Sequence, residues 1–253
     1  MELTVDDEHL GQPEGLWKAA GRHHDLKTLS WPSAKRVIVI APHPDDEVLG
    51  AGGLIQGALS RRVPITIIAV TDGEASHPSS HAPTRFDLAS VRFLESHVAL
   101  RRLGWGLPEI VQLHIPDGKV ARHRDRLEET LETVLQPGDL CVAPWRRDGH
   151  PDHDTCGDAA RSASKRVGAR PLEYLVWAWH WADPWGSDIP WDHCCRLDLT
   201  RRERARKRWA TEAFRSQTQP LGPRAADAPV LPAPLMRRFW RTYEVYVDEA
   251  DPA

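Results

Sequence analysis

Two short segments of this chain concentrate side chains that can bind a metal ion or transfer protons. The sequence "PHPDDE" covers residues 42–47, and the sequence "GHPDHD" covers residues 149–154. Two imidazoles and one carboxylate form a donor set that suits zinc and leaves a coordination position open for water or substrate. We therefore predict a metal site formed by His43, Asp46 and His153.

The other polar residues of the two segments could carry out the proton transfers of hydrolysis. Asp45 is next to the predicted ligand Asp46, where its carboxylate could deprotonate and orient an attacking water. His150 could donate a proton to a leaving amine or stabilise an oxyanion. Asp152 could hold an imidazole in the required tautomer. The implied chemistry is metal-assisted hydrolysis.

A helix cap or a phosphate loop would account for fewer residues of the first segment. Asp45 and Asp46 could merely cap a helix, but a cap needs neither His43 nor a second histidine cluster. A phosphate loop is disfavoured because "LGAGG", residues 49–53, has no P-loop lysine and no full dinucleotide fingerprint. Three acidic residues would also repel a phosphate.

Two other classes of function could use the same donor set. Two histidines and one carboxylate also form the facial triad of non-heme Fe(II) oxygenases, but Asp45 and His150 would have no role in such an oxidoreductase. A non-catalytic binding module would need no paired proton-transfer groups. We therefore favour a hydrolase, with Zn²⁺ as the expected ion and Fe²⁺ as an ion that the same ligands accept.

Apolar runs alternate with helical patterns from residue 36 onward, which is typical of βαβ units on a mostly parallel sheet. Five buried strands are predicted, over residues 36–42, 63–73, 109–118, 139–145 and 172–181. Helices are predicted over residues 47–62, 86–104, 122–139, 155–168 and 199–219, a surface loop over 220–234 and an edge strand over 241–249. In the second helix, apolar residues recur at helical spacing at Leu88, Val91, Leu94 and Val98. The two histidine segments follow the first and fourth strands, and ligands bind at the carboxyl ends of such strands.

The length of 253 residues and the apolar fraction of 41% favour one α/β domain over residues 1–253. Its motifs lie in residues 36–165, and residues 166–253 complete the sheet and the pocket. The net charge of −3 argues against a nucleic-acid partner, and the basic residues 201–209 are expected on a solvated helix face. Without a signal peptide or a membrane-spanning apolar run, we expect a soluble cytoplasmic protein. The sequence leaves a homo-oligomer open.

The motifs resemble those of the LmbE-like or PIG-L family of metal-dependent N-acetylglucosaminyl deacetylases and related amidases. Beyond the two histidine segments, the similarity includes "TDGE" (71–74), "LHIPDG" (113–118) and the spaced set Arg92, Glu95, Ala99, Leu103 and Gly104. It therefore runs over about residues 35–165. A weaker continuation comprises Lys207, Ala210, Ser216 and Gln217, with Thr211 and Phe214 where the family usually has leucine and histidine.

The resemblance implies a Rossmann-like three-layer α/β sandwich and a zinc-dependent N-deacetylase. Zinc would lie on the three predicted ligands, with Asp45 as general base. His150 would be the general acid or oxyanion stabiliser, supported by Asp152. Arg92 and Asp117 look like positions that line the substrate pocket; their alternatives are a helix-surface charge and a turn aspartate. The implied substrate is a small amino-sugar conjugate, and an amidase acting on a related conjugate is the alternative.

Five of the eleven tryptophans lie within residues 177–191. In a strand, Trp177, Trp179 and Trp181 would share one face, and His180 would point to the other. Tryptophans are most often packing residues, so we favour packing over sugar stacking, and a bond to a loop carbonyl for His180. Rim or lid contacts are expected from two further tryptophans, Trp185 and Trp191.

Overall fold

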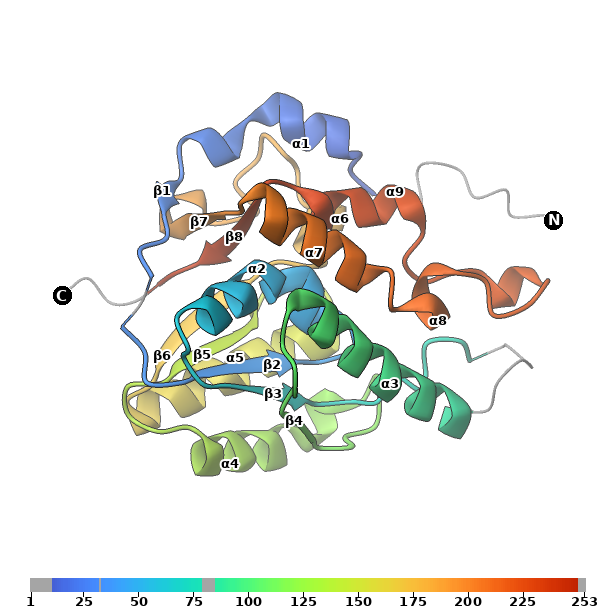
Figure 1. Cartoon of the computed structure of the whole chain (residues 1–253), viewed down its shortest axis with the longest axis horizontal. Coiled ribbons are helices and arrows are strands. Elements are labelled where there is room, and N and C mark those ends of the chain that lie inside the picture. Colours follow the sequence, from blue (N-terminus) through green and yellow to red (C-terminus); the bar gives the residue numbers. More distant parts are fainter. Residues whose placement is uncertain (1–10, 32, 79–84, 250–253) are drawn as a thin grey trace.

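The computed structural model describes residues 11–31, 33–78 and 85–249, and its central element is an eight-stranded sheet (Figure 1). The strands are β1 (Lys27–Thr28), β2 (Val37–Ala41), β3 (Ile65–Ala69), β4 (Ile110–Gln112), β5 (Leu140–Pro144), β6 (Arg170–Tyr174), β7 (Cys194–Asp198) and β8 (Tyr243–Val247). Their order is β1-β7-β8-β6-β5-β2-β3-β4. Only β8 runs antiparallel to its neighbours, so the predicted α/β fold with a mostly parallel sheet is confirmed.

Helices cover both faces of this sheet (Figure 1). They are α1 (Glu14–Ala20), α2 (Asp46–Ser60), α3 (Arg85–Leu103), α4 (Arg124–Val134), α5 (Pro151–Val167), α6 (Ala178–Trp181), α7 (Arg201–Thr211), α8 (Arg215–Thr218) and α9 (Ala233–Met236). Short 3-10 turns are η2 (Arg22–His24), η3 (Val120–His123), η4 (Trp191–His193), η5 (Ala225–Asp227) and η6 (Arg237–Trp240). On one face α7 packs on α2 and α3, and on the other α4 packs on α5. In the described part of the chain, no helix has the length and apolar character that crossing a membrane requires.

The continuous apolar run of β2 is explained by burial on both sides. Val37 and Val39 belong to the core beneath α2 and α3, whereas Ile38 and Ile40 belong to a second core beneath α4 and α5. Successive side chains of a strand point to opposite faces, so a central parallel strand needs apolar residues at every position. The same reasoning predicted β3 and β5, and both are confirmed.

The glycines after the first histidine segment allow α2 to pack closely on the sheet. A Cβ atom added to Gly50 would lie 2.1 Å from the ring of Tyr174, and one added to Gly53 would lie 2.3 Å from Leu199. Tyr174 is fully buried in β6, and its hydroxyl donates a hydrogen bond to the Ile40 carbonyl at 2.8 Å. The glycines are therefore packing residues, and no phosphate is needed to explain them.

The strand predicted over residues 172–181 was too long. β6 ends at Tyr174, and Trp177 begins the turn into α6, so the three alternating tryptophans do not share a strand face. Asp148 causes the change of direction, because its carboxylate accepts hydrogen bonds from the backbone N–H groups of Val176, Trp177 and Ala178 at 2.8–3.1 Å. Those groups therefore bond to a side chain instead of a neighbouring strand.

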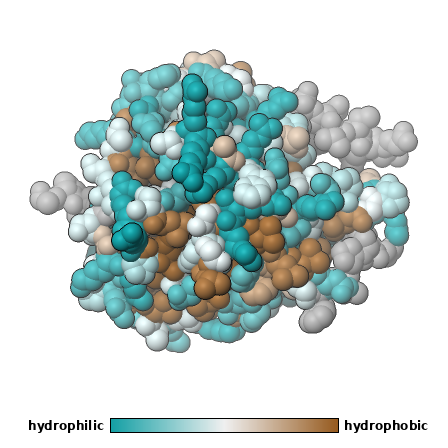
Figure 2. Space-filling view, viewed as in Figure 1, coloured by the Kyte–Doolittle hydropathy of each residue, from teal (hydrophilic) through white to brown (hydrophobic). Residues whose placement is uncertain are grey.

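Three further predictions about the elements were wrong. The C-terminal strand β8 is not an edge strand, since it lies between β6 and β7. The residues predicted as a loop over 220–234 include η5 and the start of α9. In α3, Leu88 is buried as predicted, but Val91, Leu94 and Val98 are 41%, 62% and 43% exposed, so the predicted apolar stripe is not the buried face along its whole length. Figure 2 shows apolar side chains gathered on the face of the molecule where α3 lies in Figure 1.

Candidate metal centre and substrate cavity

The two histidine segments meet at the point where the connections of the sheet change direction. β2 leads to β3 on one side, while its other neighbour is β5. The loop after β2 carries the first segment, and the loop after β5 carries the second, which begins α5. In open parallel sheets, this switch point between adjacent strands leaves a crevice in which ligands bind.

Three side-chain atoms from these segments form a nearly equilateral triangle. His43 Nδ1 lies 3.4 Å from Asp46 Oδ2 and 3.3 Å from His153 Nε2, and the last two atoms are 3.2 Å apart. Ligands on a tetrahedral zinc ion, each about 2.0–2.1 Å from the metal, would be roughly 3.3 Å apart. These residues therefore fit a divalent ion. Among the described residues, two other groups have possible ligand atoms within 4.8 Å of one another, namely His43–His150–His153 and His43–Asp117–Asp152.

Carboxylates on the far side of the His43 ring fix its orientation. Asp152 Oδ2 lies 3.4 Å and Asp117 Oδ1 lies 3.3 Å from His43 Nε2. Asp152 also accepts hydrogen bonds from the N–H groups of Gly118 and Val120, at 2.8 and 3.1 Å. With Nε2 bonded to a carboxylate, Nδ1 is left as the electron-pair donor.

The carboxylate of Asp148 orients the ring of His153 in the same way. Its Oδ2 lies 2.9 Å from His153 Nδ1, which leaves Nε2 directed to the triangle. Burial alone would lower the pKa of His153, but the carboxylates of Asp46 and Asp148 raise it to about 9. The centre therefore favours positive charge, as a cation site must.

Asp45 lies beside the triangle in a strained conformation. Its φ angle is 140°, a value that residues with a Cβ atom rarely adopt. The residue is 5% exposed and its carboxylate makes no capping bond to α2, so this side chain is not a helix cap. Burial and the neighbouring charges of Asp46 and Glu47 raise the pKa of Asp45 well above its usual range.

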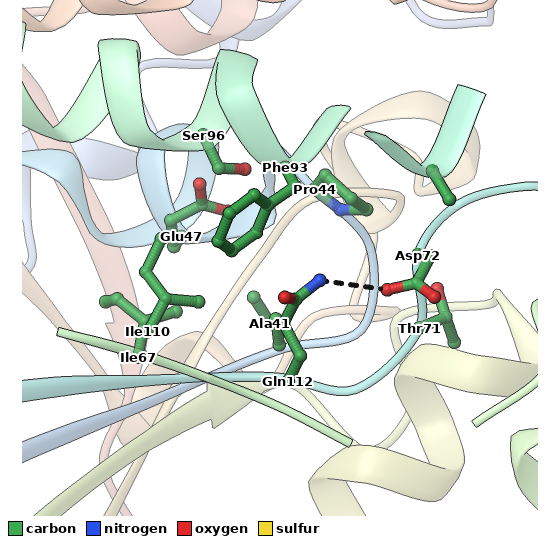
Figure 3. A pocket seen from close by; sticks show the side chains of 12 residues that line it. Ala41, Pro44, Glu47, Ile67, Thr71, Asp72, Phe93, Ser96, Ile110 and Gln112 are labelled. Carbon is green, nitrogen blue, oxygen red and sulfur yellow. Dashed lines mark hydrogen bonds between the residues drawn. The ribbon is translucent and has the colours of Figure 1, made fainter. Parts of the chain in front are cut away.

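Glu47 supports this strained residue from the other side of the loop. Its Oε2 accepts a hydrogen bond from the Asp45 N–H at 3.0 Å, while Oε1 has no partner among the described residues. Burial raises the pKa of Glu47 to about 7. Figure 3 shows it with Phe93 and Ser96 at a cavity of about 20 Å³, which is large enough for one water molecule.

His150 caps the start of α5 with its ring. Its Nδ1 accepts a hydrogen bond from the Asp152 N–H at 3.2 Å, so the neutral ring carries its proton on Nε2. Burial, followed by the charges of His43 and His153, lowers the pKa of His150 to about 4. The ring is therefore a neutral hydrogen-bond donor, and it lines the cavity beside the triangle.

The triangle opens into a cavity of about 330 Å³. Arg92, one of the predicted substrate residues, lines it and is buried, so the helix-surface alternative is wrong. Its guanidinium donates to the Gly73 carbonyl and the Ser76 hydroxyl. Asp117 also lines the cavity, but its contacts are with His43 and with the N–H of Ala75 at 2.9 Å.

The tryptophan-rich segment contributes to the cavity in part. Trp177 lines it and stacks on His150, with ring centroids 5.5 Å apart, and His180 also lines it. Trp179 instead packs on Trp17 in the core. Rim contacts are not observed for the other two predicted tryptophans, because Trp191 packs against Trp17 and Trp179 and neither it nor Trp185 lines the cavity.

The weak C-terminal motif supports the first histidine segment. Gln217 donates a hydrogen bond to the carbonyl of Pro44, and the hydroxyl of Ser216 bonds to Glu95 at 2.7 Å. Phe214 is fully buried in the core, which explains how the chain accommodates it in place of a histidine.

Sequence reasoning missed three residues that matter for this geometry. Asp148 and Glu47 lie within or beside the histidine segments, but only the folded loops show that they bond to His153 and to Asp45. Leu235 lines the cavity from α9, just after the loop predicted over residues 220–234 and in a segment for which no element was predicted. No local sequence pattern predicts that Leu235 lines the cavity.

The fold and centre define an α/β protein with a His/Asp cluster that could hold a metal ion, at the switch point of a parallel sheet. A family model described as PIG-L, GlcNAc-PI de-N-acetylase, matches residues 38–164, about half of the chain, and the chain belongs to this family. A probable N-acetyl-alpha-D-glucosaminyl L-malate deacetylase 2 from Bacillus anthracis is 30% identical over 162 residues. That match covers 56% of this chain and 66% of the relative, just under two thirds of its length.

Solved structures share the fold at lower identity. A conserved protein from Thermus thermophilus has a TM-score of 0.57 at 24% identity, and the match covers 87% of this chain and 96% of that one. The zinc-inhibited form of teicoplanin deacetylase has a TM-score of 0.59 at 18% identity, covering 86% and 100%. These likenesses confirm the fold.

Proposed function

We propose that this protein is a metal-dependent N-deacetylase that removes the acetyl group from an N-acetylglucosamine-type amino sugar. The observation that carries the proposal is the triangle of His43 Nδ1, Asp46 Oδ2 and His153 Nε2, with sides of 3.2–3.4 Å, at the wall of a cavity. Asp45 and His150 line the same cavity and supply two proton-handling groups. Family membership and the names of the relatives agree with this assignment.

The three triangle residues would hold the ion, which we propose to be Zn²⁺, although the donor set also suits Fe²⁺. Such an ion would supply a Lewis acid that polarises the amide carbonyl and lowers the pKa of water. Asp152 and Asp148 would keep the two imidazoles in the tautomers that expose Nδ1 of His43 and Nε2 of His153.

The chain's own residues would carry the protons. Asp45 accepts a proton from the attacking water while the new C–O bond forms at the amide carbon. His150 donates a hydrogen bond from its Nε2–H to the carbonyl oxygen as negative charge develops there, and it keeps its proton. Asp45 then returns the proton to the amine nitrogen as the C–N bond breaks, which releases acetate and the free amino sugar.

Acetate release from a panel of N-acetylated glucosamine conjugates tests the proposal, with metal analysis on the same sample. We expect release with about one divalent ion per chain, and release must persist without oxygen, which distinguishes hydrolysis from Fe(II)-dependent oxidation. Both Zn²⁺ and Fe²⁺ should be assayed at stoichiometric and excess levels. Loss of all release in every metal form would reject the function.

Asp45→Asn provides the sharper test. This variant should retain the ion and lose about 10²–10⁴-fold in turnover. Asp158→Asn is the matched control, because Asp158 lies on α5 with a side chain 47% exposed and outside the cavity lining. Unchanged turnover in Asp45→Asn would remove Asp45 from the role of base.

A further inference from the structure

The cavity has two chemically different walls. The wall at the metal centre includes His43, Asp45 and Asp46, from the part of the chain that the family model matches. The lining contributed after that part includes an apolar wall of Leu231, Leu235 and Phe239, together with the polar side chains of Gln217 and Arg238. The three apolar residues are 4–8% exposed, so the rest of the protein packs against most of their surface.

Hydrogen bonds hold the apolar wall at a set position relative to the metal centre. Gln217 donates its side-chain N–H to the carbonyl of Pro44, next to His43, and its own backbone carbonyl accepts the N–H of Leu231 at 2.9 Å. On the other side of this segment, the carbonyl of Ala228 lies 3.0 Å from His77 Nε2. One residue, Gln217, therefore connects the catalytic loop to the apolar wall.

We propose that this wall binds an apolar group of the substrate, so that the preferred substrate is an amino-sugar conjugate carrying an alkyl or aryl group. This inference rests on the proposed function. A sugar ring displays hydroxyl groups on its edge, and the side chains of Leu231, Leu235 and Phe239 offer them no hydrogen-bond partner. An apolar group covering the same surface would instead be removed from water.

The apolar group could be carried on the nitrogen as a longer acyl chain or on the anomeric oxygen as an aglycone. Two matched series distinguish these sources. The first comprises methyl, butyl and hexyl N-acetylglucosaminides, and the second comprises methyl glucosaminides with N-acetyl, N-butanoyl and N-hexanoyl groups. We expect kcat/KM to rise about fourfold per added methylene in one series and to stay flat in the other.

Variants of the wall link this preference to the structure. Leu235→Ala should lower kcat/KM for the hexyl or hexanoyl substrate at least tenfold more than it lowers kcat/KM for the methyl N-acetyl substrate. Leu107→Ala is the control, because Leu107 is 90% exposed and outside the cavity. If Leu235→Ala fails to fold, Leu235→Met and Phe239→Leu retain an apolar core and should shift the chain-length optimum.

Binding measurements separate failure of this inference from failure of the proposed function. Calorimetry with Asp45→Asn measures the affinity of the subsite without turnover. Hexyl and methyl N-acetylglucosaminide are compared as ligands below micelle-forming concentrations. If the acyl series showed the effect, the N-hexanoyl substrate replaces the hexyl glycoside. Tighter binding of the longer ligand without acetate release by the wild type would leave the subsite standing and reject the function. Acetate release with no dependence on chain length in either series would support the proposed function and reject the apolar subsite. A carboxylate-bearing aglycone that outperforms the butyl group would also overturn the inference.

Discussion

The carboxylate of Glu47 accepts a hydrogen bond from the backbone N–H of Asp45, two residues earlier, at 3.0 Å. Asp45 has a φ angle of 140°, and a residue in such a conformation costs about 1–3 kcal/mol. The carbonyl of Asp45 accepts the N–H groups of Val48 and Leu49, both at 2.9 Å. Both the N–H and the carbonyl of the residue proposed as the base are thus hydrogen-bonded. Of these three bonds, the one to Glu47 involves a side chain.

Removal of the Glu47 carboxylate should therefore disturb the base without removing the ion. We expect Glu47→Ala to lower kcat about 10–100-fold with little change in KM, because misplacement of a catalytic group by about 1 Å can cost that much. Glu47→Gln keeps an acceptor oxygen and should recover most of the loss. Steady-state kinetics and metal analysis of both variants check this, with Ser60→Ala at the end of α2 as control. Equal loss in the Ala and Gln variants would point to a role in folding instead.

Asp148→Asn tests the support of His153. Asp148 bonds to His153 Nδ1 at 2.9 Å and accepts three backbone N–H groups at the end of β6. Loss of such a supporting carboxylate should weaken divalent-ion affinity about 10–100-fold and lower the free energy of unfolding as well. Competition with a chelating indicator measures the affinity. Asp158→Asn should leave it unchanged, and wild-type affinity in Asp148→Asn would contradict the assignment.

A pair of glycine variants tests the packing of α2. Gly50→Ala should destabilise the protein by about 1–3 kcal/mol through overpacking, because the new methyl group would lie 2.1 Å from the Tyr174 ring. Gly15→Ala, in α1, has no atom within 4 Å of the added Cβ and should instead stabilise by about 0.5–1 kcal/mol. Urea unfolding of both proteins measures the difference. Equal changes in the two would show that helix propensity, and not packing, dominates.

Much of the sheet could be predicted from sequence because its central strands obey a local rule. β2, β3 and β5 are short apolar runs, and burial on both faces requires that pattern. The rule fails where a side chain distant in the sequence determines the conformation of the backbone. Residues 177–181 alternate like a strand but turn into α6, because Asp148 bonds their N–H groups. The predicted apolar stripe of α3 was wrong in part for a related reason, since the buried face includes the polar Arg92 and Ser96, each of which lines a different cavity.

The residues that meet in the candidate site could be predicted from the sequence, because parallel strands bring their carboxyl ends together. His43 and His153 are 110 residues apart, yet their ring nitrogens lie 3.3 Å apart. Chemical identity and strand position suffice for such a prediction. The apolar wall that includes Leu235 could not be predicted, because the segment before α9 is placed by tertiary contacts such as the hydrogen bond from the Leu231 N–H to the Gln217 carbonyl.

Lys207 and Glu244 join α7, β8 and α2 through a buried ion pair of 2.5 Å. Lys207 also donates to the Leu49 carbonyl at 2.8 Å, and Glu244 accepts the N–H groups of Gly53 and Leu54. Lys207→Met should destabilise the protein by about 3–5 kcal/mol, because it leaves a buried carboxylate without its counter-charge.

The double variant Lys207→Met/Glu244→Gln should lose less stability than Lys207→Met alone, since a neutral amide needs no counter-charge and its oxygen still accepts a backbone N–H. Arg202→Met, at an exposed position of the same helix, is the control and should leave the free energy of unfolding nearly unchanged. Denaturant unfolding of the three proteins tests the pair. If the double variant is less stable than Lys207→Met, the buried charge of Glu244 stabilises α2 independently of Lys207, and the pair is not the unit that holds these elements together.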